Sequence, residues 1–288
     1  MSTAGDPAGS RFAVDAAFAR EVAEAAGRIL FERYERVESI DYKSARDVVT
    51  DVDHLSEALI MDAIRQRFPG DGILAEESGA HHGPEANADA DAAARALVHG
   101  RTWIIDPLDG TVNYANGIPY FCVSVALVVD GQPTVGAVHD PMRGETFWAT
   151  ADGQAHLDDD VIHASRKERL TDYVISMALG GRAVATRGRA VRRAIRVSRN
   201  TGSAALALAY VARGRFDAFV QTGGMSAWDI AAAGLIAERG GAVVTDVAGG
   251  PWFDVDQATR SFGIVAAPAP HHAELLALSR EAPRTTGP

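Results

Sequence analysis

The sequence is poor in cysteine, in long apolar runs and in positive charge. Its one cysteine, Cys122, allows no intrachain disulfide, which fits a reducing cytoplasm as the expected location. No apolar run approaches the roughly 20 residues needed to cross a bilayer, so no membrane partner is expected. The formal net charge of −10 lacks the basic excess typical of nucleic-acid-binding proteins, so no nucleic-acid partner is expected either.

The composition indicates a globular protein with a large core. Hydrophobic residues make up 47% of the 288 residues, which is enough for one large domain or two modest ones. We expect an N-terminal α+β half over residues 11–150 that carries most of the candidate metal ligands. A C-terminal α/β half over 151–280 is expected to close the site, and 1–10 and 281–288 are expected to be flexible tails.

Hydrophobic periodicity predicts alternating helices and strands in both halves. Helical spacing predicts a helix from Phe12 to about Tyr34 and a second helix, capped by Thr50 or Asp51, that runs to about Phe68. Short turns between apolar runs predict an antiparallel meander over 121–129, 135–138 and 146–149. The later part predicts strands at 174–177, 216–220, 243–245 and 264–266, and helices from about 187, over 203–212, over 228–239 and after 270. This pattern favours layered α/β sandwiches.

The stretch from Trp103 to Asn113 carries the strongest chemical signal. Trp103 to Ile105 reads as a short buried strand that stops at a cluster of turn residues. Asp106 and Asp109 follow, and Gly110-Thr111 supplies a turn and a helix start with free backbone N–H groups. Two carboxylates beside anion-binding amides suit a metal-assisted reaction on a phosphate ester. The alternative is a turn whose aspartates only cap backbone groups.

Four acidic signals lie at the ends of predicted elements. They are Asp53, the pair Glu76-Glu77, Asp106 with Asp109, and Asp229 after Trp228. Mg²⁺ prefers oxygen ligands, and carboxylates from several segments can build such a site, with a backbone carbonyl at Leu108 to complete it. Bound cations would also solve an electrostatic problem, because a protein of net charge −10 repels a phosphate ester.

These motifs together resemble the inositol monophosphatase family of Mg²⁺-dependent, lithium-sensitive phosphatases. The resemblance covers about residues 12 to 280 and implies alternating α-β-α-β-α layers, a sandwich similar to that of fructose-1,6-bisphosphatase. It is carried by Asp47-Val-Val-Thr-Asp-Val-Asp53, Ala75-Glu-Glu-Ser78, Asp106-Pro-Leu-Asp-Gly-Thr-Val-Asn113, Trp228-Asp-Ile-Ala-Ala-Ala-Gly234, Gly240-Gly-Ala-Val-Val-Thr-Asp246 and Gly249-Gly-Pro251.

The resemblance implies a role for each matching residue. Glu76, Asp106 and the Leu108 carbonyl would hold one Mg²⁺ ion; Asp106, Asp109 and Asp229 would hold a second; and Glu76 would reach a third through water. Thr111, oriented by Asp53, would help Glu76 to activate the attacking water. The amides of Gly110 and Thr111 would bind the phosphate, and Lys43 falls in a loop that is a lid in the family.

The substrate is less sharply implied than the chemistry. Gly202, Ser203, Ala204 and Asp229 match the segments that meet the inositol ring, but the family's inositol-binding glutamate falls on Gln221. A glutamine can hydrogen-bond a hydroxyl but lacks the charge that strengthens such bonds. We therefore expect hydrolysis of inositol monophosphate or a similar polyol phosphate. The alternative is another small ester, such as histidinol phosphate or fructose 1,6-bisphosphate.

Partners and surfaces give further expectations. The resemblance implies a homodimer, and it leaves open a non-enzymatic regulatory role, because some family members also act on transcription machinery. The run of arginines from Arg187 to Arg199 is read as a solvated helix face, with an anion or subunit contact as the alternative. Cys122 lies in an apolar alternating run and is expected to be a buried, inert thiol.

Overall fold

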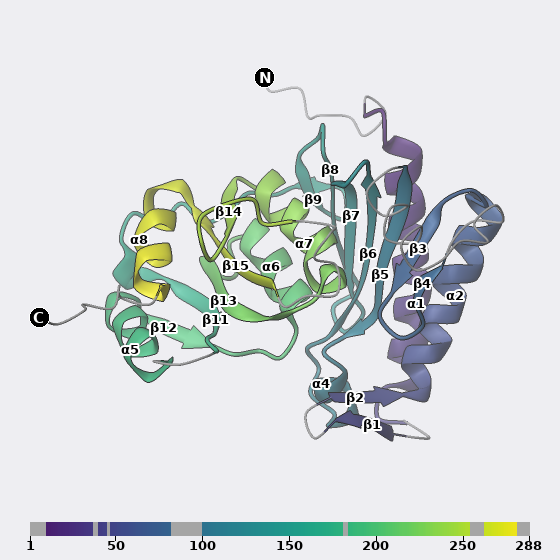
Figure 1. The fold of residues 1–288 in the computed structure, drawn as a ribbon, viewed down its shortest axis with the longest axis horizontal. Helices are drawn as coiled ribbons and strands as arrows, with labels where there is room; N and C mark the ends of the chain where they lie inside the picture. Colours follow the sequence, from purple (N-terminus) through teal and green to yellow (C-terminus); the bar gives the residue numbers. More distant parts are fainter. Residues whose placement is uncertain are drawn as a thin grey trace, which may run out of the picture.

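Two sheets and three layers of helices alternate through the molecule (Figure 1). The computed structural model describes residues 10–36, 40–44, 47–81, 100–180, 184–253 and 262–280. An eight-stranded sheet has the order β10-β9-β8-β7-β6-β5-β3-β4, and a five-stranded sheet has the order β12-β11-β13-β15-β14. A two-stranded ladder, β1 (Ile40–Ser44) with β2 (Asp47–Thr50), lies apart from both. The expected α-β-α-β-α layers are confirmed.

The eight-stranded sheet contains the meander that the sequence predicts. Its strands β6 (Cys122–Val129), β7 (Gln132–Asp140) and β8 (Glu145–Thr150) pair antiparallel in sequence order. The remaining strands are β3 (Gly72–Ala75), β4 (Gly79–His81), β5 (Arg101–Asp109), β9 (Ala155–Leu157) and β10 (Asp160–Val161). We expected residues 78 to 100 to form a surface loop; instead β4 pairs with β3, and residues 82–99 lie outside the described chain.

Helices α1 (Ala13–Arg33) and α2 (Asp51–Arg67) pack on the outer face of this sheet. A buried apolar face on each helix drives this packing. The predicted cap of α2 is confirmed, because the Thr50 side chain accepts from the backbone and Asp53 closes a capping box. Such a cap stabilises a helix by about 0.5–2 kcal/mol and fixes where α2 begins. Asp53 is thereby placed at the helix N-terminus.

The space between the two sheets is filled by α6 (Ala204–Ala212) and α7 (Ala227–Arg239). Both helices are almost entirely buried, and their many alanines let them approach the strands closely. Gly136 of β7 shows how closely: a Cβ there would lie 2.6 Å from the carbonyl oxygen of Ala232. Helix α7 and the eight-stranded sheet therefore meet backbone to backbone at this position.

The five-stranded sheet carries α5 (Val184–Ala194) and α8 (Ala269–Ser279) on its far face. Its strands are β11 (Val174–Ala178), β12 (Val197–Arg199), β13 (Ala218–Met225), β14 (Ala242–Asp246) and β15 (Phe262–Pro268), and a short 3₁₀ turn, η2 (Leu170–Asp172), precedes β11. Strand β12 was not predicted. Its three residues form the edge of the sheet beside β11, and so short a run has no clear period.

One predicted boundary was wrong where it matters most. The strand expected to stop at Ile105 continues as β5 to Asp109, and both aspartates lie on it. Pairing with β6 extends the strand, since Asp106 faces Ser124 and Asp109 faces Cys122, with a register shift between them. A shift of this kind bends the strand and re-aims its side chains. Tertiary pairing has overridden the local turn signal of Pro107, whereas the turn signal of Gly110 is realised just after the strand.

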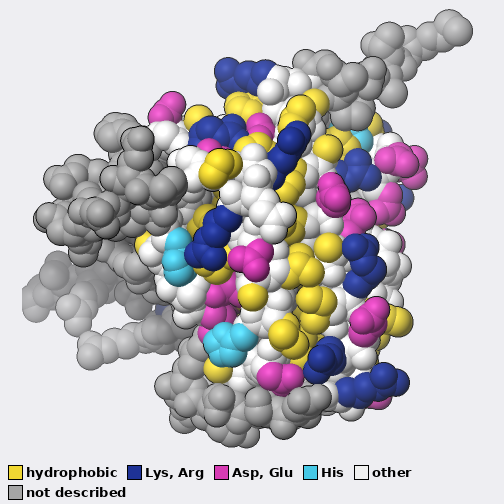
Figure 2. All heavy atoms as spheres, turned by 90° about the vertical axis from the view of Figure 1, so that its right-hand side faces the viewer, with side chains coloured by type: hydrophobic (Ala, Val, Ile, Leu, Met, Phe, Trp, Pro, Cys, Tyr) yellow, Lys and Arg dark blue, Asp and Glu magenta, His cyan; other side chains and the backbone are white. Residues whose placement is uncertain are grey.

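The face formed by α1 and α2 mixes acidic, basic and hydrophobic side chains, with no single sign of charge over it (Figure 2). Large hydrophobic side chains exposed on these helices are Val14, Phe31 and Leu55. Over the described residues, no helix combines the length and the apolar character that a membrane span requires.

Candidate active site

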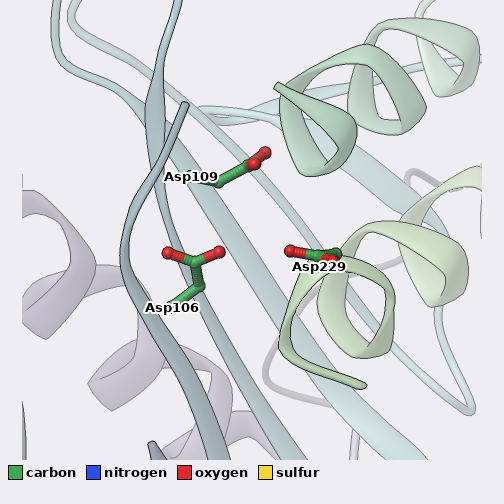
Figure 3. Close-up of side chains that lie close together, drawn as sticks. All are labelled: Asp106, Asp109 and Asp229. Carbon is green, nitrogen blue, oxygen red and sulfur yellow. The ribbon is translucent and has the colours of Figure 1, made fainter. Parts of the chain in front are cut away.

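Three carboxylates from two separate parts of the fold meet between the sheets (Figure 3). Asp106 and Asp109 come from the end of β5, and Asp229 comes from the first turn of α7. One oxygen of each lies within 4.8 Å of one oxygen of the other two, a spacing that could hold a metal ion. Among the described residues, this is the one such group of three or more His, Cys, Asp or Glu side chains.

The pleat of β5 explains why Asp106 points toward α7. Side chains alternate between the two faces of a strand, so residues two apart share a face. Trp103 and Ile105 face α1 and α2, whereas Ile104 joins the core around α6 and α7. Asp106 shares the face of Ile104, and its ladder partner Ser124 donates a hydrogen bond to the carbonyl oxygen of Trp228. Strand β6 thus fixes the residue before Asp229 relative to Asp106.

Asp109 joins β5 to the N-terminus of α6. Its Oδ2 accepts hydrogen bonds from Ser203 Oγ and from the Ala205 amide, each at 2.6 Å, and its Oδ1 accepts from the Ala204 amide at 3.3 Å. A carboxylate at a helix N-terminus also interacts favourably with the helix dipole. Asp109 is therefore held in place by the residues that the sequence assigned to the substrate, Ser203 and Ala204.

Asp229 is held by the start of its own helix. In the capping box of α7, its Oδ2 accepts a hydrogen bond from the Ser226 amide at 2.6 Å, and the Ser226 side chain in turn caps the helix. Sequence analysis gave Asp229 no capping role. The structure shows that the capping geometry also directs this carboxylate toward Asp106.

The three carboxylates repel one another. Burial, followed by the charges of Glu76, Asp109 and Asp229, raises the pKa of Asp106 well above its usual value. Burial and the charge of Asp109 do the same to the pKa of Asp229. Burial raises the pKa of Asp109 less effectively, because the hydrogen bonds from α6 oppose it. A buried group of like charges suits a cation, so this donor set fits Mg²⁺.

Asp53 and Thr111 form a second, connected pair. Thr111 Oγ1 lies 3.2 Å from Asp53 Oδ1 and 2.9 Å from the carbonyl oxygen of Leu108, so its single hydrogen can be donated to either. The other oxygen of Asp53 accepts from the amide and hydroxyl of Thr50. Burial raises the pKa of Asp53 to about 6, although the hydrogen bonds from Thr50 lower it. The carboxylate is therefore poised to exchange a proton near neutral pH.

Glu76 lies beside the three aspartates, with its side chain in hydrogen-bond contact with Asp106, but it does not lie within 4.8 Å of all three. It follows β3, and its amide donates to the Ile105 carbonyl at 3.2 Å, which fixes it next to β5. Its charge acts on both Asp106 and Asp229. Glu77, by contrast, donates its amide to Glu57 Oε2 on α2. The structure therefore separates the two adjacent glutamates, with Glu76 nearest to the aspartates.

A cavity of about 320 Å³ opens beside Asp109 and Asp229. Gly202, Ser203, Ala204 and Gln221 line it, so the structure brings the predicted substrate residues to one place next to the carboxylates. Gln221 donates from Nε2 to the Gly223 carbonyl at 3.1 Å, which orients its amide. Gly110 is the residue before α4 (Thr111–Ala115), and its φ of 101° is a conformation that suits glycine.

Some residues in or beside the cavity were given no role by sequence reasoning. One of them, Asn113, lies beside the cavity without lining it. Asn113 donates to the carbonyl oxygens of Tyr120 and Thr201, at 2.7 and 2.8 Å, and so ties α4 to the loop before α6. Gly202 (φ 81°) must be glycine there, because a Cβ would lie 2.8 Å from Asn113 Oδ1. Ser176 and Asn200 also line the cavity. Period-2 alternation in β11 could have identified Ser176, whereas Asn200 follows the unpredicted strand β12.

Two further predicted features are Lys43 and the arginine run. Lys43 falls in β1, and its side chain lies outside what the structure describes. The arginine run spans α5 and β12 and is largely exposed, and part of it has structural contacts. Arg196 pairs with Asp172 at 2.8 Å, and Arg187 donates to the carbonyl oxygens of Gly180 and Ser279.

Burial raises the pKa of the Cys122 thiol well above its usual value, with the charges of Asp109 and Asp106 adding to the effect. This residue is fully buried. The raised pKa and the full burial of Cys122 both agree with the expectation of an inert thiol.

Comparison with known proteins places this geometry in context. The family model described as "Inositol monophosphatase family" matches residues 13–284. The Nus factor SuhB of Pasteurella multocida is 36% identical over 238 residues, which cover 79% of this chain and 83% of that protein. Two solved structures are similar at 30% identity: the extragenic suppressor protein suhB of Bartonella henselae, with a TM-score of 0.79 and 91% and 96% of the two chains covered, and the Thermotoga maritima IMPase, with a TM-score of 0.77 and 92% and 96% covered.

Proposed function

The chain belongs to the inositol monophosphatase family and is a phosphatase, and from this premise we propose that it hydrolyses inositol monophosphate or a similar small polyol phosphate with Mg²⁺. The observation that carries the proposal is the meeting of Asp106, Asp109 and Asp229 beside a cavity that also contains Gln221. Those carboxylates could hold a metal, and the cavity has room for a small ester.

We propose that Asp106 belongs to two metal sites, with Glu76 and the Leu108 carbonyl at one and Asp109 and Asp229 at the other. Two or three ions follow from the family resemblance. Bound there, Mg²⁺ would activate water and offset the charge of the phosphate. The raised pKa values of Asp106 and Asp229 support this assignment, because neutralising their mutual repulsion is what a cation would do.

The protein's own groups would position the reactants and move the proton. Thr111 hydrogen-bonds Asp53 through Oγ1, so a proton taken from water near Glu76 can pass to Asp53, whose pKa of about 6 suits acceptance near neutral pH. The amides of Gly110 and Thr111, at the start of α4, would bind the phosphate. Ser203, Ala204 and Gln221 would meet the hydroxyls of the alcohol.

A phosphate-release screen tests this function directly. Purified protein with Mg²⁺ should release phosphate from inositol monophosphate, and lithium and chelation of the metal should both inhibit. Asp106→Asn should abolish release, whereas Asp62→Asn, a matched change on exposed α2, should not. If no phosphate is released from a panel of polyol, sugar, nucleotide and amino-alcohol esters, the proposed activity is refuted.

Gln221 is the residue that we propose sets the choice of alcohol. It is neutral where the family has a glutamate, so its hydrogen bonds to substrate hydroxyls are weaker than those of a carboxylate. Gln221→Glu should raise kcat/KM for inositol monophosphate by about tenfold, the worth of a stronger, charge-assisted bond. A variant that loses activity equally on every ester of the panel would contradict this role.

A second function is favoured by the names of the relatives. Several proteins about 35% identical to this chain are called Nus factors, so we propose a regulatory role as the alternative. Asp106→Asn separates the two, because it should abolish turnover and leave a binding role intact. A homodimer in the cytoplasm is also proposed, from the family resemblance and the single cysteine, and sedimentation analysis at several protein concentrations would test the dimer.

A further inference from the structure

A second cavity, of about 380 Å³, lies between α1 and the loop ends of β7 and β8. We call it the α1–β7 cavity. It shares no lining residue with the active-site cavity, so it needs an explanation of its own. The lining residues that bear on its chemistry are Glu24, Arg28, Phe31, Glu32, His139 and Asp158.

The ring of His139 is fixed in one tautomer by its neighbours. His139 is buried, with 8% of its surface exposed, and its Nδ1 lies 3.0 Å from Thr146 Oγ1. The Thr146 hydroxyl donates its single hydrogen to Glu24 Oε1 at 2.9 Å, so toward His139 it can only accept. Nδ1 therefore carries the hydrogen. In the neutral ring, this leaves Nε2 as a bare acceptor.

The neutral state of His139 follows from its burial. Burial lowers its pKa below the usual value, although the charges of Glu24, Asp140 and Asp158 oppose this and that of Arg28 adds to it. The edge of the ring that carries Nε2 lies over Gly27 of α1, where a Cβ would be 2.8 Å from Nε2. Gly27 also lines the cavity, so the acceptor borders the open space.

The charges around this acceptor are mainly negative. Glu24, Glu32 and Asp158 face one arginine, Arg28, across the lining. Asp158 holds φ of 52°, an unusual conformation for a residue other than glycine, while its Oδ1 accepts from the Thr146 amide at 2.9 Å. An anion would meet both this negative charge and the lone pair of Nε2, so the cavity disfavours phosphates and carboxylates.

A bare metal ion does not fit the cavity either. Throughout the described part of the chain, the one group of three ligand side chains close enough for an ion is that of Asp106, Asp109 and Asp229. The carboxylates here are spread around a larger volume, which suits a polyatomic cation. Such a cation must bring an N–H to Nε2, and the exposed ring of Phe31 could cover its apolar part.

We propose that the α1–β7 cavity binds a small primary alkylammonium ion, which donates an N–H to His139 Nε2 while Glu24, Glu32 and Asp158 balance its charge. The site is separate from the proposed phosphatase chemistry and does not depend on it. The contacts that build it join residues far apart in the chain, since Thr146 and Glu24 are 122 positions apart.

The test compares two cations of the same charge on the intact protein at neutral pH. n-Butylammonium has N–H donors, whereas tetramethylammonium, which carries the same single charge, has none. n-Butylammonium should shift the ¹⁵N resonance of His139 Nε2 in a saturable way, and tetramethylammonium should not. No saturable shift with n-butylammonium, or equal shifts with both cations, overturns the proposal.

Two further variants test the charges and the ring. Glu32→Gln should weaken n-butylammonium binding about two- to fivefold, the usual strength of an exposed ion pair. Glu21→Gln, an exposed change on the same helix outside the cavity, should leave binding unchanged. Equal weakening by both variants would indicate attraction to general surface charge and overturn the site. His139→Phe keeps a ring in place and should abolish calorimetrically detected binding with phosphate release unaffected; retained binding overturns the role of Nε2.

Discussion

Neutralising the two aspartates of β5 should change the stability of the metal-free protein in opposite directions. Asp106 is buried among Glu76, Asp109 and Asp229, whose charges disfavour its ionised form. At 4.8 Å and an effective dielectric constant of 20, each like-charge pair costs about 3 kcal/mol. Protonation relieves part of that cost, so Asp106→Asn should stabilise the metal-free protein by about 1–2 kcal/mol.

Asp109 responds differently because it already has partners. It accepts from Ser203 Oγ and the Ala205 amide at 2.6 Å, and hydrogen bonds to a charged group contribute about 1.5–3 kcal/mol each. An asparagine keeps one acceptor oxygen and turns an NH₂ group toward the amides of α6. The lost hydrogen-bond energy exceeds the gain from reduced repulsion between the carboxylates. Asp109→Asn should therefore destabilise the metal-free protein by about 1–2 kcal/mol, a fall in Tm of roughly 2–8 °C for a chain of this size.

Thermal unfolding with a chelator, and again with Mg²⁺, measures both effects. Asp106→Asn should raise the Tm without metal, Asp109→Asn should lower it, and both should lose the stabilisation that Mg²⁺ gives the wild type. Asp62→Asn, which changes an exposed carboxylate, should match the wild type in both conditions. If Asp106→Asn destabilises the metal-free protein as much as Asp109→Asn does, it is wrong that repulsion dominates at Asp106 and that hydrogen bonds from α6 dominate at Asp109.

Three other outcomes follow from the same structure. Phosphate release should fall as the pH drops through about 6, because protonated Asp53 no longer accepts from Thr111, and Asp53→Asn should remove this limb of the pH–rate profile. Calorimetric titration with Mg²⁺ near pH 6 should show proton release, because the raised pKa values of the aspartates leave protons bound in the metal-free site. The measured binding heat should therefore change with the ionisation enthalpy of the buffer, and a heat independent of the buffer would contradict this. Gly136→Ala should destabilise the fold by about 2–4 kcal/mol in chemical denaturation, because its Cβ would strike the backbone of Ala232, whereas Gly70→Ala, which meets nothing within 4 Å, should not.

Local signals were enough for most elements of the fold. The period of α1, the cap of α2 at Thr50 and the short turns of the β6–β8 meander are all encoded within a few residues, and all three predictions are confirmed. Strand β5 was predicted too short because its second half is stabilised by pairing with β6, which lies further along the chain. The edge strand β12 is too short to show a period. The division into halves at residues 150 and 151 stays a prediction.

The residue types of the candidate ligands could be read from the sequence. The contacts that bring these residues together and hold them could be seen only in the structure. Asp106, Asp109 and Asp229 stood out because they lie at the ends of two predicted elements, the strand from Trp103 and the helix over 228–239. Spacing could not show that they meet. The hydrogen bond from Ser203, at the start of α6, to Asp109 joins residues more than 90 positions apart. His139 received no role from the sequence, because its importance depends on Thr146 and Glu24, and no local pattern relates those residues.

The capping of α6 by Asp109 has a consequence for how the protein is made. During synthesis the N-terminal segments leave the ribosome first, and β5 emerges long before α6 and α7. Until those helices dock, Asp109 lacks its donors, and Asp106 lacks the partner that Asp229 provides. A nascent chain is therefore unable to assemble the three-aspartate site before residue 229 is available. Catalytic competence arrives late in biogenesis, when α6 and α7 from the last third of the polypeptide fold onto β5.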